Sequence, residues 1–196
     1  KSSYSEEGAN VLISAYGGEF CDTHTITTTD VQSTNGYNDG SGDGGSSADY
    51  AGNNDYTRCM NGTSAATPGV TGVVALVLEA NPALTWREVR RVLATTARKN
   101  DATDLGWVLN SAGLSINHKY GYGVVNASAA TQAARTWPDA GTLLSANEVI
   151  ATGTAMPSVP IPDNNATGAT STITLSTTGI SGVEFVELTV TSNHAE

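Results

Sequence analysis

One segment constrains the fold of this chain more than any other, a turn of small residues that runs directly into an apolar stretch. Residues 61–69 read Asn-Gly-Thr-Ser-Ala-Ala-Thr-Pro-Gly, and residues 70–78 are almost wholly apolar. Gly62 permits a tight turn, and the apolar stretch predicts a buried helix of about ten residues, too short to cross a membrane. Ser64 is therefore expected at the start of a helix, where unpaired N–H groups and the positive end of the helix dipole favour negative charge.

Two interpretations of Ser64 are compatible with this spacing. Its hydroxyl could act as a nucleophile, with the helix-terminal amides stabilising an oxyanion. Pro68 is expected in the first turn of the helix, where a missing N–H costs nothing. Alternatively, the Thr-Ser pair at 63–64 merely caps an ordinary helix.

Two further helices are predicted downstream. Asn81-Pro82 should end the first helix. The run Thr-Trp-Arg-Glu at 85–88 is a capping-box pattern. It is followed by an apolar face, with arginines expected largely outside that face. The apolar face comprises Val89, Val92, Leu93 and Thr96, and the arginines are Arg87, Arg90, Arg91 and Arg98. Residues 126–135 predict a third, alanine-rich helix.

The charge balance excludes some classes of partner. The chain has 19 acidic and 9 basic residues, a formal net charge of −10. Such an acidic chain argues against nucleic acid and against an anionic membrane surface as partners. No apolar run approaches the roughly 18–20 residues that span a bilayer.

The two cysteines, Cys21 and Cys59, suggest one disulfide and an oxidising compartment in a chain of this composition. Two buried free thiols are the alternative.

The two ends of the chain have little helical pattern. Residues 1–60 are predicted to be loop-rich, with short strands at 11–13 and 25–31 and a turn-forming tract at 37–54. In residues 138–196, alternation around Ile173 and Leu175, and again at Val186, Leu188 and Val190, predicts strands of an antiparallel β-domain. Three or four strands would leave open edges, which indicates the beginning of a domain.

Residues 61–68 closely resemble the nucleophile motif of subtilisin-like serine proteases. Residues 78–89, residues 118–127 and the Tyr-Ser-Glu at 4–6 resemble the kexin-like (proprotein convertase) branch, as in a secreted bacterial member. The resemblance implies an α/β subtilisin-like domain, of which residues 1–137 are the C-terminal part, with three helices and short strands. Residues 138–196 would then be a linker and the first strands of an antiparallel β-sandwich P-domain.

The resemblance also implies a chemistry. Ser64 would be the acylated nucleophile, and its own N–H would be one oxyanion donor. In the family, the triad Asp and His precede the serine. None of His24, His118 and His194 stands in the His-Gly-Thr context of the family's base. The triad is therefore expected to be incomplete in this chain, and the N-terminal portion of the same protease is expected as a tightly bound partner.

Glu6 is the second site residue that the resemblance implies. The matching glutamate of kexin-like enzymes helps to hold a calcium ion beneath the pocket for the P1 side chain, and calcium prefers carboxylate oxygens. A solvated acid beside Glu7 is the alternative. Residues 39–44 partly match a calcium loop, but Tyr50 stands where a bidentate Glu would be expected, which favours a flexible acidic insertion.

The function implied is that of a calcium-dependent serine endopeptidase, secreted and extracellular, that cleaves proteins and peptides after basic residues, especially basic pairs. Broader trypsin-like or subtilisin-like cleavage is an alternative, because upstream specificity residues are absent from the chain. The rival of a different class is a non-catalytic secreted binding module, in which Ser64 only caps a helix. An inactive fragment is a further alternative.

Overall fold

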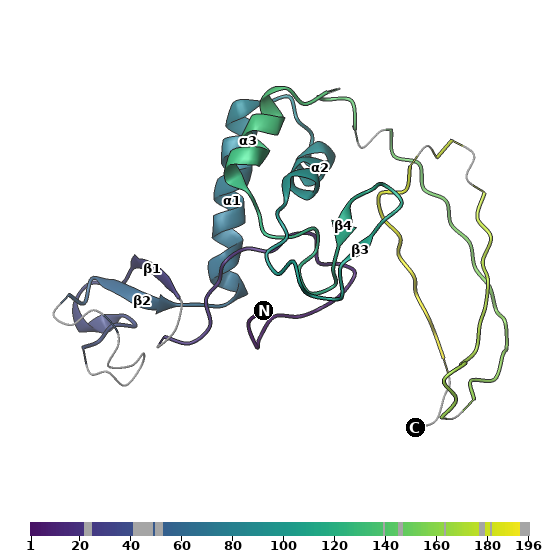
Figure 1. The fold of residues 1–196 in the computed structure, drawn as a ribbon, viewed down its shortest axis with the longest axis horizontal. Helices are drawn as coiled ribbons and strands as arrows, with labels where there is room; N and C mark the ends of the chain where they lie inside the picture. The colour runs from purple at the N-terminus through teal and green to yellow at the C-terminus, as the bar shows by residue number, and fades with distance from the viewer. Residues whose placement is uncertain are drawn as a thin grey trace. The chain divides into compact units, whose positions relative to one another are not determined.

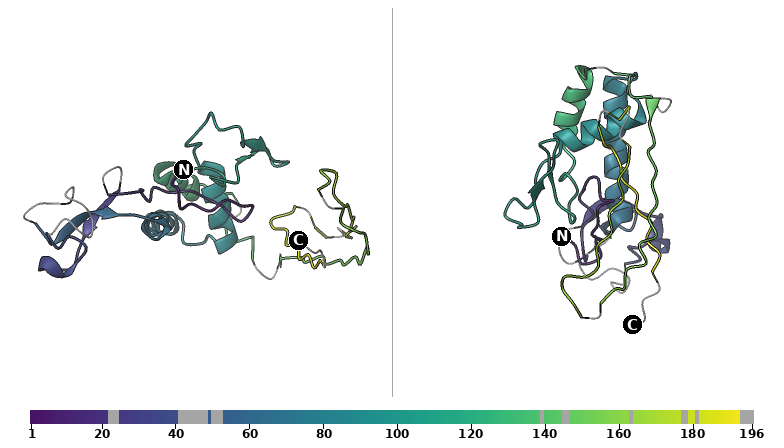
Figure 2. Two further views of the ribbon diagram at one scale, coloured as in Figure 1. Left: turned by 90° about the horizontal axis from the view of Figure 1, so that it is seen from below. Right: turned by 90° about the vertical axis from the view of Figure 1, so that its right-hand side faces the viewer.

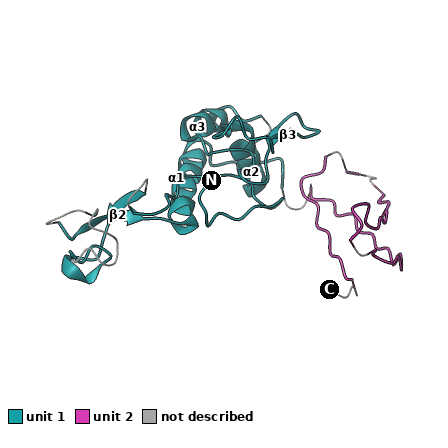
Figure 3. Cartoon of the chain, turned by 60° about the horizontal axis from the view of Figure 1, so that its bottom comes forward, with its two compact units in different colours: residues 1–144 teal, residues 145–196 magenta. Residues whose placement is uncertain are grey.

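The structure, a computed structural model, describes residues 1–21, 25–40, 49, 53–138, 140–144, 147–162, 164–176, 179–180 and 182–192. The chain divides into two compact units, residues 1–144 and residues 145–196 (Figure 3). Each unit is described by itself below. The predicted domain boundary lies between residues 137 and 138, whereas the first compact unit continues to Leu144.

The central element of the first unit is helix α1, Thr63–Ala80. It begins at the predicted turn and ends where expected, with Asn81 as its C-cap residue. It has 18 residues, so the expected length of about ten was wrong. The small residues before Val70 continue the helix instead of forming a separate turn.

Much of the surface of α1 is exposed, contrary to the expectation of a buried helix. Val73 and Val77 are buried, whereas Leu76 is 47% exposed and Leu78 is 38% exposed. The reason is that α2 and α3 cover only part of a helix that is apolar on nearly all sides.

Helix α1 is also long and apolar enough, by length and composition, to cross a membrane, which corrects the expectation that no stretch approaches that length. The core helix of a soluble protein passes the same test.

Helix α2, Trp86–Thr96, begins with the capping box that the sequence predicts. The Thr85 hydroxyl accepts the backbone N–H of Glu88, and the Glu88 carboxylate accepts that of Thr85 at 2.7 Å. Arg87 was expected outside the apolar face but is buried, and its Nη1 donates to the carbonyl of Leu144 at 2.9 Å.

Helix α3, Ala127–Arg135, confirms the third predicted helix, with the Asn126 side chain as its N-cap. Figures 1 and 2 show α2 and α3 beside α1. Asn81 Nδ2 donates to the carbonyl of Ala134 at 2.9 Å and ties the end of α1 to α3. The core between the helices and the loop before α2 consists of Val73, Val77, Leu84, Val89, Val92, Leu93, Ala130 and Ala134.

Two short strands lie before α1. β1, Ile26–Thr29, pairs antiparallel with β2, Tyr56–Met60, and a short 3₁₀ helix, Ser33–Asn35, follows β1. The Cys21–Cys59 disulfide joins this pair to the preceding loop, which confirms the predicted bridge and removes the free-thiol alternative. Most of the tract at 37–54, including Asp43 and Tyr50, lies outside the described residues.

The segment at 11–13 is not a strand of its own. Instead, Ser14 makes a parallel bridge with Val124, next to an antiparallel bridge between Arg98 and Val124. Gly121 and Gly123 have φ of +60° and +127°, and a Cβ on either would collide with a backbone carbonyl of Leu12 or Arg98. These glycines let three distant segments meet. A short antiparallel pair, β3 (Val108–Leu109) and β4 (Ser115–Ile116), precedes them.

The second unit has no α-helix and no paired strand among its described residues. The prediction of strands around Ile173 and from Val186 to Val190 is therefore wrong, because these segments do not pair with another strand. Their apolar side chains are exposed. An alternating segment forms a stable strand only when a neighbour completes its hydrogen bonds and covers its apolar face, and no described residue of this unit makes such a pair.

Candidate functional site

Ser64 is the second residue of α1, and its side chain is exposed. The N-cap position is occupied by Gly62, with φ +93° and ψ 172°, and no side chain caps the helix. Ser64 Oγ makes no hydrogen bond within the part of the chain that the structure describes. The helix-capping interpretation of the Thr-Ser pair is therefore wrong, and the hydroxyl is left available at the entrance of the helix.

The backbone amides around this hydroxyl are divided into two groups. The N–H groups of Ala65 and Ala66 donate to the Gly62 carbonyl at 3.0 and 3.2 Å. The N–H groups of Thr63 and Ser64 have no acceptor among the described residues. Two unpaired donors beside an exposed hydroxyl, at the positive end of an 18-residue helix, can stabilise an oxyanion.

Pro68 lies deeper in the helix than expected. It is inside α1, at its sixth residue, and not in the first turn. Because proline has no N–H, the carbonyl of Ser64 loses the i to i+4 hydrogen bond that an ordinary helix would supply. Both backbone polar groups of Ser64 are therefore outside the regular helical pattern.

The described residues bring no general base to Ser64. His118 is exposed, and its side chain makes no hydrogen bond within the described ranges. His24 and His194 lie outside the described residues. The expectation that the triad Asp and His come from elsewhere stays a prediction.

Glu6 is exposed and has no hydrogen-bond partner in the described part of the chain. No group of three or more His, Cys, Asp or Glu side chains gathers among the described residues. Calcium takes six to eight oxygen ligands. The described residues therefore do not form a calcium site by themselves, and Glu6 could supply only one carboxylate of such a site.

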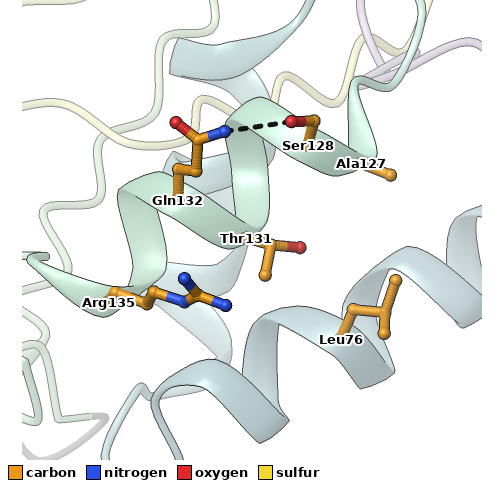
Figure 4. Close-up of a pocket in the computed structure, with 6 residues that line it drawn as sticks. All are labelled: Leu76, Ala127, Ser128, Thr131, Gln132 and Arg135. Atoms are coloured by element: carbon orange, nitrogen blue, oxygen red, sulfur yellow. Dashed lines mark hydrogen bonds between the residues drawn. The ribbon is translucent and has the colours of Figure 1, made fainter.

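A shallow hollow lies between α1 and α3, away from Ser64 (Figure 4). Figure 4 shows Thr131 and Arg135 of α3 on the side that faces α1, where Leu76 lies. Gln132 Nε2 donates to Ser128 Oγ at 3.0 Å on the same helix. This hollow has no nucleophile with an adjacent base, so the sequence motif and the hollow do not coincide.

The buried Glu88 carboxylate has the most perturbed environment in the helical core, with only 1% of the residue exposed. Burial alone raises its pKa, but hydrogen bonds from the backbone N–H groups of Thr85, Gly141 and Leu143 outweigh burial and lower the pKa from 4.5 to about 2. These bonds hold the chain that follows α3 against the start of α2. The role of Glu88 is structural.

A second polar cluster supports the loop that carries the two close-packed glycines. The Asp104 carboxylate accepts hydrogen bonds from Lys119 Nζ at 2.7 Å and Asn117 Nδ2 at 2.9 Å, and these bonds lower its pKa to about 2. The Lys119 hydrogen bond to Asp104 raises the lysine pKa in turn. Burial, followed by the hydrogen bond to Asp101, raises the pKa of Tyr120. The Asp104–Lys119 and Asp101–Tyr120 pairs stabilise this loop, and neither pair makes a hydrogen bond to Ser64.

Comparison with known proteins identifies the family. Residues 1–123 match the sequence profile described as the subtilase family. The chain is 45% identical over 85 residues to PC3-like endoprotease variant B of Hydra vulgaris, a match that covers 42% of this chain and 12% of the relative. It is 30% identical over 192 residues to proprotein convertase subtilisin/kexin type 7 of Homo sapiens, covering 97% of this chain and 22% of the relative.

A solved structure is similar to about two thirds of the chain. The Aeromonas sobria serine protease, in its complex with a chaperone, has a TM-score of 0.64 and 32% identity, and the match covers 69% of this chain and 27% of that chain. The present chain thus spans about a quarter or less of the length of these relatives.

Proposed function

Because this chain belongs to the subtilase family, we propose that it carries the nucleophile of a serine endopeptidase. Ser64 would be that nucleophile. The observation that carries the proposal is the exposed Ser64 hydroxyl at the second residue of α1, which does not cap the helix. It lies beside two backbone N–H groups that have no acceptor among the described residues. The family's motif falls on the same residues.

The reaction would be acyl transfer. Ser64 Oγ attacks the carbonyl carbon of the peptide bond while an imidazole takes its proton. The negative oxygen that forms faces the N–H of Ser64 at the helix terminus. The imidazole then protonates the leaving amine, and water releases the acyl group from Ser64. In this proposal, the imidazole and its orienting aspartate belong to the N-terminal portion of the same protease, since none of the three histidines stands in the family's His-Gly-Thr context.

We assign the enzyme to the kexin-like branch, with cleavage after basic residues and especially basic pairs. Several relatives are named proprotein convertases, and one of them matches 97% of this chain. The acidic chain, with its net charge of −10, suits a basic substrate. A secreted, extracellular location and a P-domain at residues 138–196 belong to the same assignment. The name of the Aeromonas sobria relative, an extracellular serine protease, supports the location.

A panel of peptides with Arg, Lys, Leu or Phe at the P1 position tests the specificity. A kexin-like enzyme should prefer Arg and Lys at P1, and more strongly when a second basic residue precedes them. Equal rates on Leu and Phe peptides would instead establish the broader subtilisin-like cleavage.

A fluorophosphonate probe tests the nucleophile on the full-length polypeptide that contains this sequence. We expect one covalent adduct, located on Ser64 by peptide mapping, and no labelling after Ser64→Ala. Thr63→Ala is the matched control, because it removes a neighbouring exposed hydroxyl and should leave labelling intact. If the full-length polypeptide is not labelled, the result favours the rival function, a non-catalytic binding module.

We also propose that calcium supports this enzyme and that Glu6 contributes one carboxylate to its site. The support is chemical, since Glu6 is an exposed carboxylate without another partner in the described chain. Glu7 is the control, because its carboxylate is already paired with Lys1 Nζ at 2.9 Å. Calcium binding to the full-length protein is measured by isothermal titration calorimetry. Glu6→Gln should have a higher Kd for calcium than Glu7→Gln. Equal affinities in the two variants would remove Glu6 from the site.

A further inference from the structure

The turn that precedes Ser64 is held by the N-terminal segment through a single hydroxyl. The backbone N–H of Gly62 donates to Tyr4 Oη at 3.1 Å, and that hydroxyl donates in turn to the carbonyl of Gly18. The hydroxyl of Tyr4 therefore joins three segments that are far apart in the sequence, namely residues 1–5, residues 17–19 and the turn before α1.

The other peptide group of Gly62 is fixed as well. Its carbonyl accepts the N–H groups of Ala65 and Ala66, and the backbone of Gly17 lies directly against it. A Cβ on Gly17 would come within 2.5 Å of the Gly62 oxygen, so only glycine fits there. Both sides of the turn are thus supported by residues near the N-terminus.

The supporting segment has its own connections. Ser2 Oγ donates to the carbonyl of Gly18 at 2.9 Å, and the N–H of Ser3 donates to the Glu19 carboxylate at 3.0 Å. These bonds hold residues 2–3 against residues 18–19, next to the Gly18 carbonyl that accepts the Tyr4 hydroxyl. The Tyr4 hydroxyl that accepts the Gly62 N–H therefore belongs to a segment that is itself held by hydrogen bonds.

We propose that Tyr4 is a positioning residue for Ser64, an inference that rests on the proposed protease function. Gly62 has φ +93°, a backbone conformation that favours glycine, and glycine has no side chain that could pack against neighbours and hold the turn. The Tyr4 hydroxyl supplies that restraint by fixing the N–H of Gly62. Without it, the peptide group before Gly62 loses its restraint, and Ser64 Oγ and the Ser64 N–H can shift together relative to a bound substrate.

A change in position of this kind affects the chemical step more than substrate binding. Small displacements of a nucleophile reduce rates by roughly 10- to 100-fold, whereas the substrate pocket is not built from the Tyr4 hydroxyl in this proposal. The expected signature is therefore a lower kcat with an almost unchanged KM.

The test compares Tyr4→Phe with Tyr16→Phe in the full-length enzyme. Each variant removes one tyrosine hydroxyl, and that of Tyr16 contacts only Arg98 Nη2, at 3.1 Å, among the described residues. Titration with a fluorophosphonate counts the competent sites, so that kcat per site is independent of any misfolded fraction. We expect Tyr4→Phe to lower kcat per site and the rate of fluorophosphonate labelling by roughly 10-fold or more, with KM within about twofold, and Tyr16→Phe to match the parent enzyme.

Two results would overturn the inference, and they are distinguishable. If the parent enzyme labels at Ser64 and Tyr4→Phe retains its kcat per site, Tyr4 does not position the nucleophile, while the protease function stands. If the parent enzyme is not labelled at all, the proposed function fails and this inference fails with it.

Discussion

The Glu88 carboxylate accepts a hydrogen bond from the backbone N–H of Gly141 at 2.9 Å, across 53 residues of sequence. The N–H groups of Thr142 and Leu143 donate to the other oxygen at 3.1 and 3.3 Å. One buried side chain thus caps the start of α2 and also fastens the segment that follows α3. This explains why the first compact unit continues to Leu144.

Replacement of Glu88 by Gln should destabilise the first unit by about 2–4 kcal/mol. Glutamine keeps one acceptor oxygen, but its NH₂ group would face N–H donors that now point at the carboxylate, and these would be buried without partners. Glu79→Gln, at an exposed position on α1, is the control and should change the free energy of unfolding by less than about 0.5 kcal/mol. Urea denaturation of the full-length protein, followed by near-ultraviolet circular dichroism, measures both. A loss below about 1 kcal/mol in Glu88→Gln would contradict the proposed clamp.

The same carboxylate predicts how stability depends on pH. Its pKa is about 2 in the folded protein and 4.5 as the ordinary value, so it stabilises the fold fully above pH 4.5. That contribution is lost as the pH falls from about 4.5 toward 2, because protonation then becomes easier in the unfolded chain than in the folded one. The free-energy gap between the parent protein and Glu88→Gln should therefore shrink by up to about 3 kcal/mol over this interval. A gap that stays constant from pH 7 to pH 2 would show that the folded pKa is not lowered.

Whether the sequence predicts each of these contacts depends on how far apart its two residues lie along the chain. The capping box at 85–88 was predictable because its two partners are three residues apart on one helix. The bonds from Glu88 to Gly141 were not, since they depend on how the chain returns after α3. The buried position of Arg87 was missed for the same reason, because its partner is the carbonyl of Leu144.

The candidate site divides in a similar way. The turn before Ser64 and its place at a helix start follow from a local run of residues, and the structure has both. The contact of Tyr4 with Gly62 joins residues 58 positions apart, and no periodic pattern indicates it. The strands expected around Ile173 failed to form pairs because alternation specifies which faces are apolar but supplies no neighbouring strand.

Thr85→Ala should destabilise the protein, whereas Ser64→Ala should leave its stability almost unchanged. Ser64 Oγ makes no capping bond, so its removal should shift Tm by no more than about 2 °C. The Thr85 hydroxyl accepts the N–H of Glu88 and is a true cap, so Thr85→Ala should cost about 1 kcal/mol. Differential scanning calorimetry of both variants measures the contrast. A larger loss in Ser64→Ala than in Thr85→Ala would return Ser64 to a capping role and weaken the case for a nucleophile.

Gly123→Ala should be far more damaging than Gly113→Ala, although both glycines have positive φ, +127° and +77°. A Cβ at Gly123 would collide with the carbonyl of Arg98, where backbone atoms cannot withdraw without breaking the bridge between Arg98 and Val124. At Gly113, no atom lies within 4 Å of the new Cβ, so only the backbone strain of about 1 kcal/mol applies. Gly123→Ala should therefore cost about 2 kcal/mol more than Gly113→Ala in the free energy of unfolding, since the collision adds to the strain. Equal losses in denaturant titrations of the two variants would mean that the segments around residues 98 and 123 do not approach each other as closely as described.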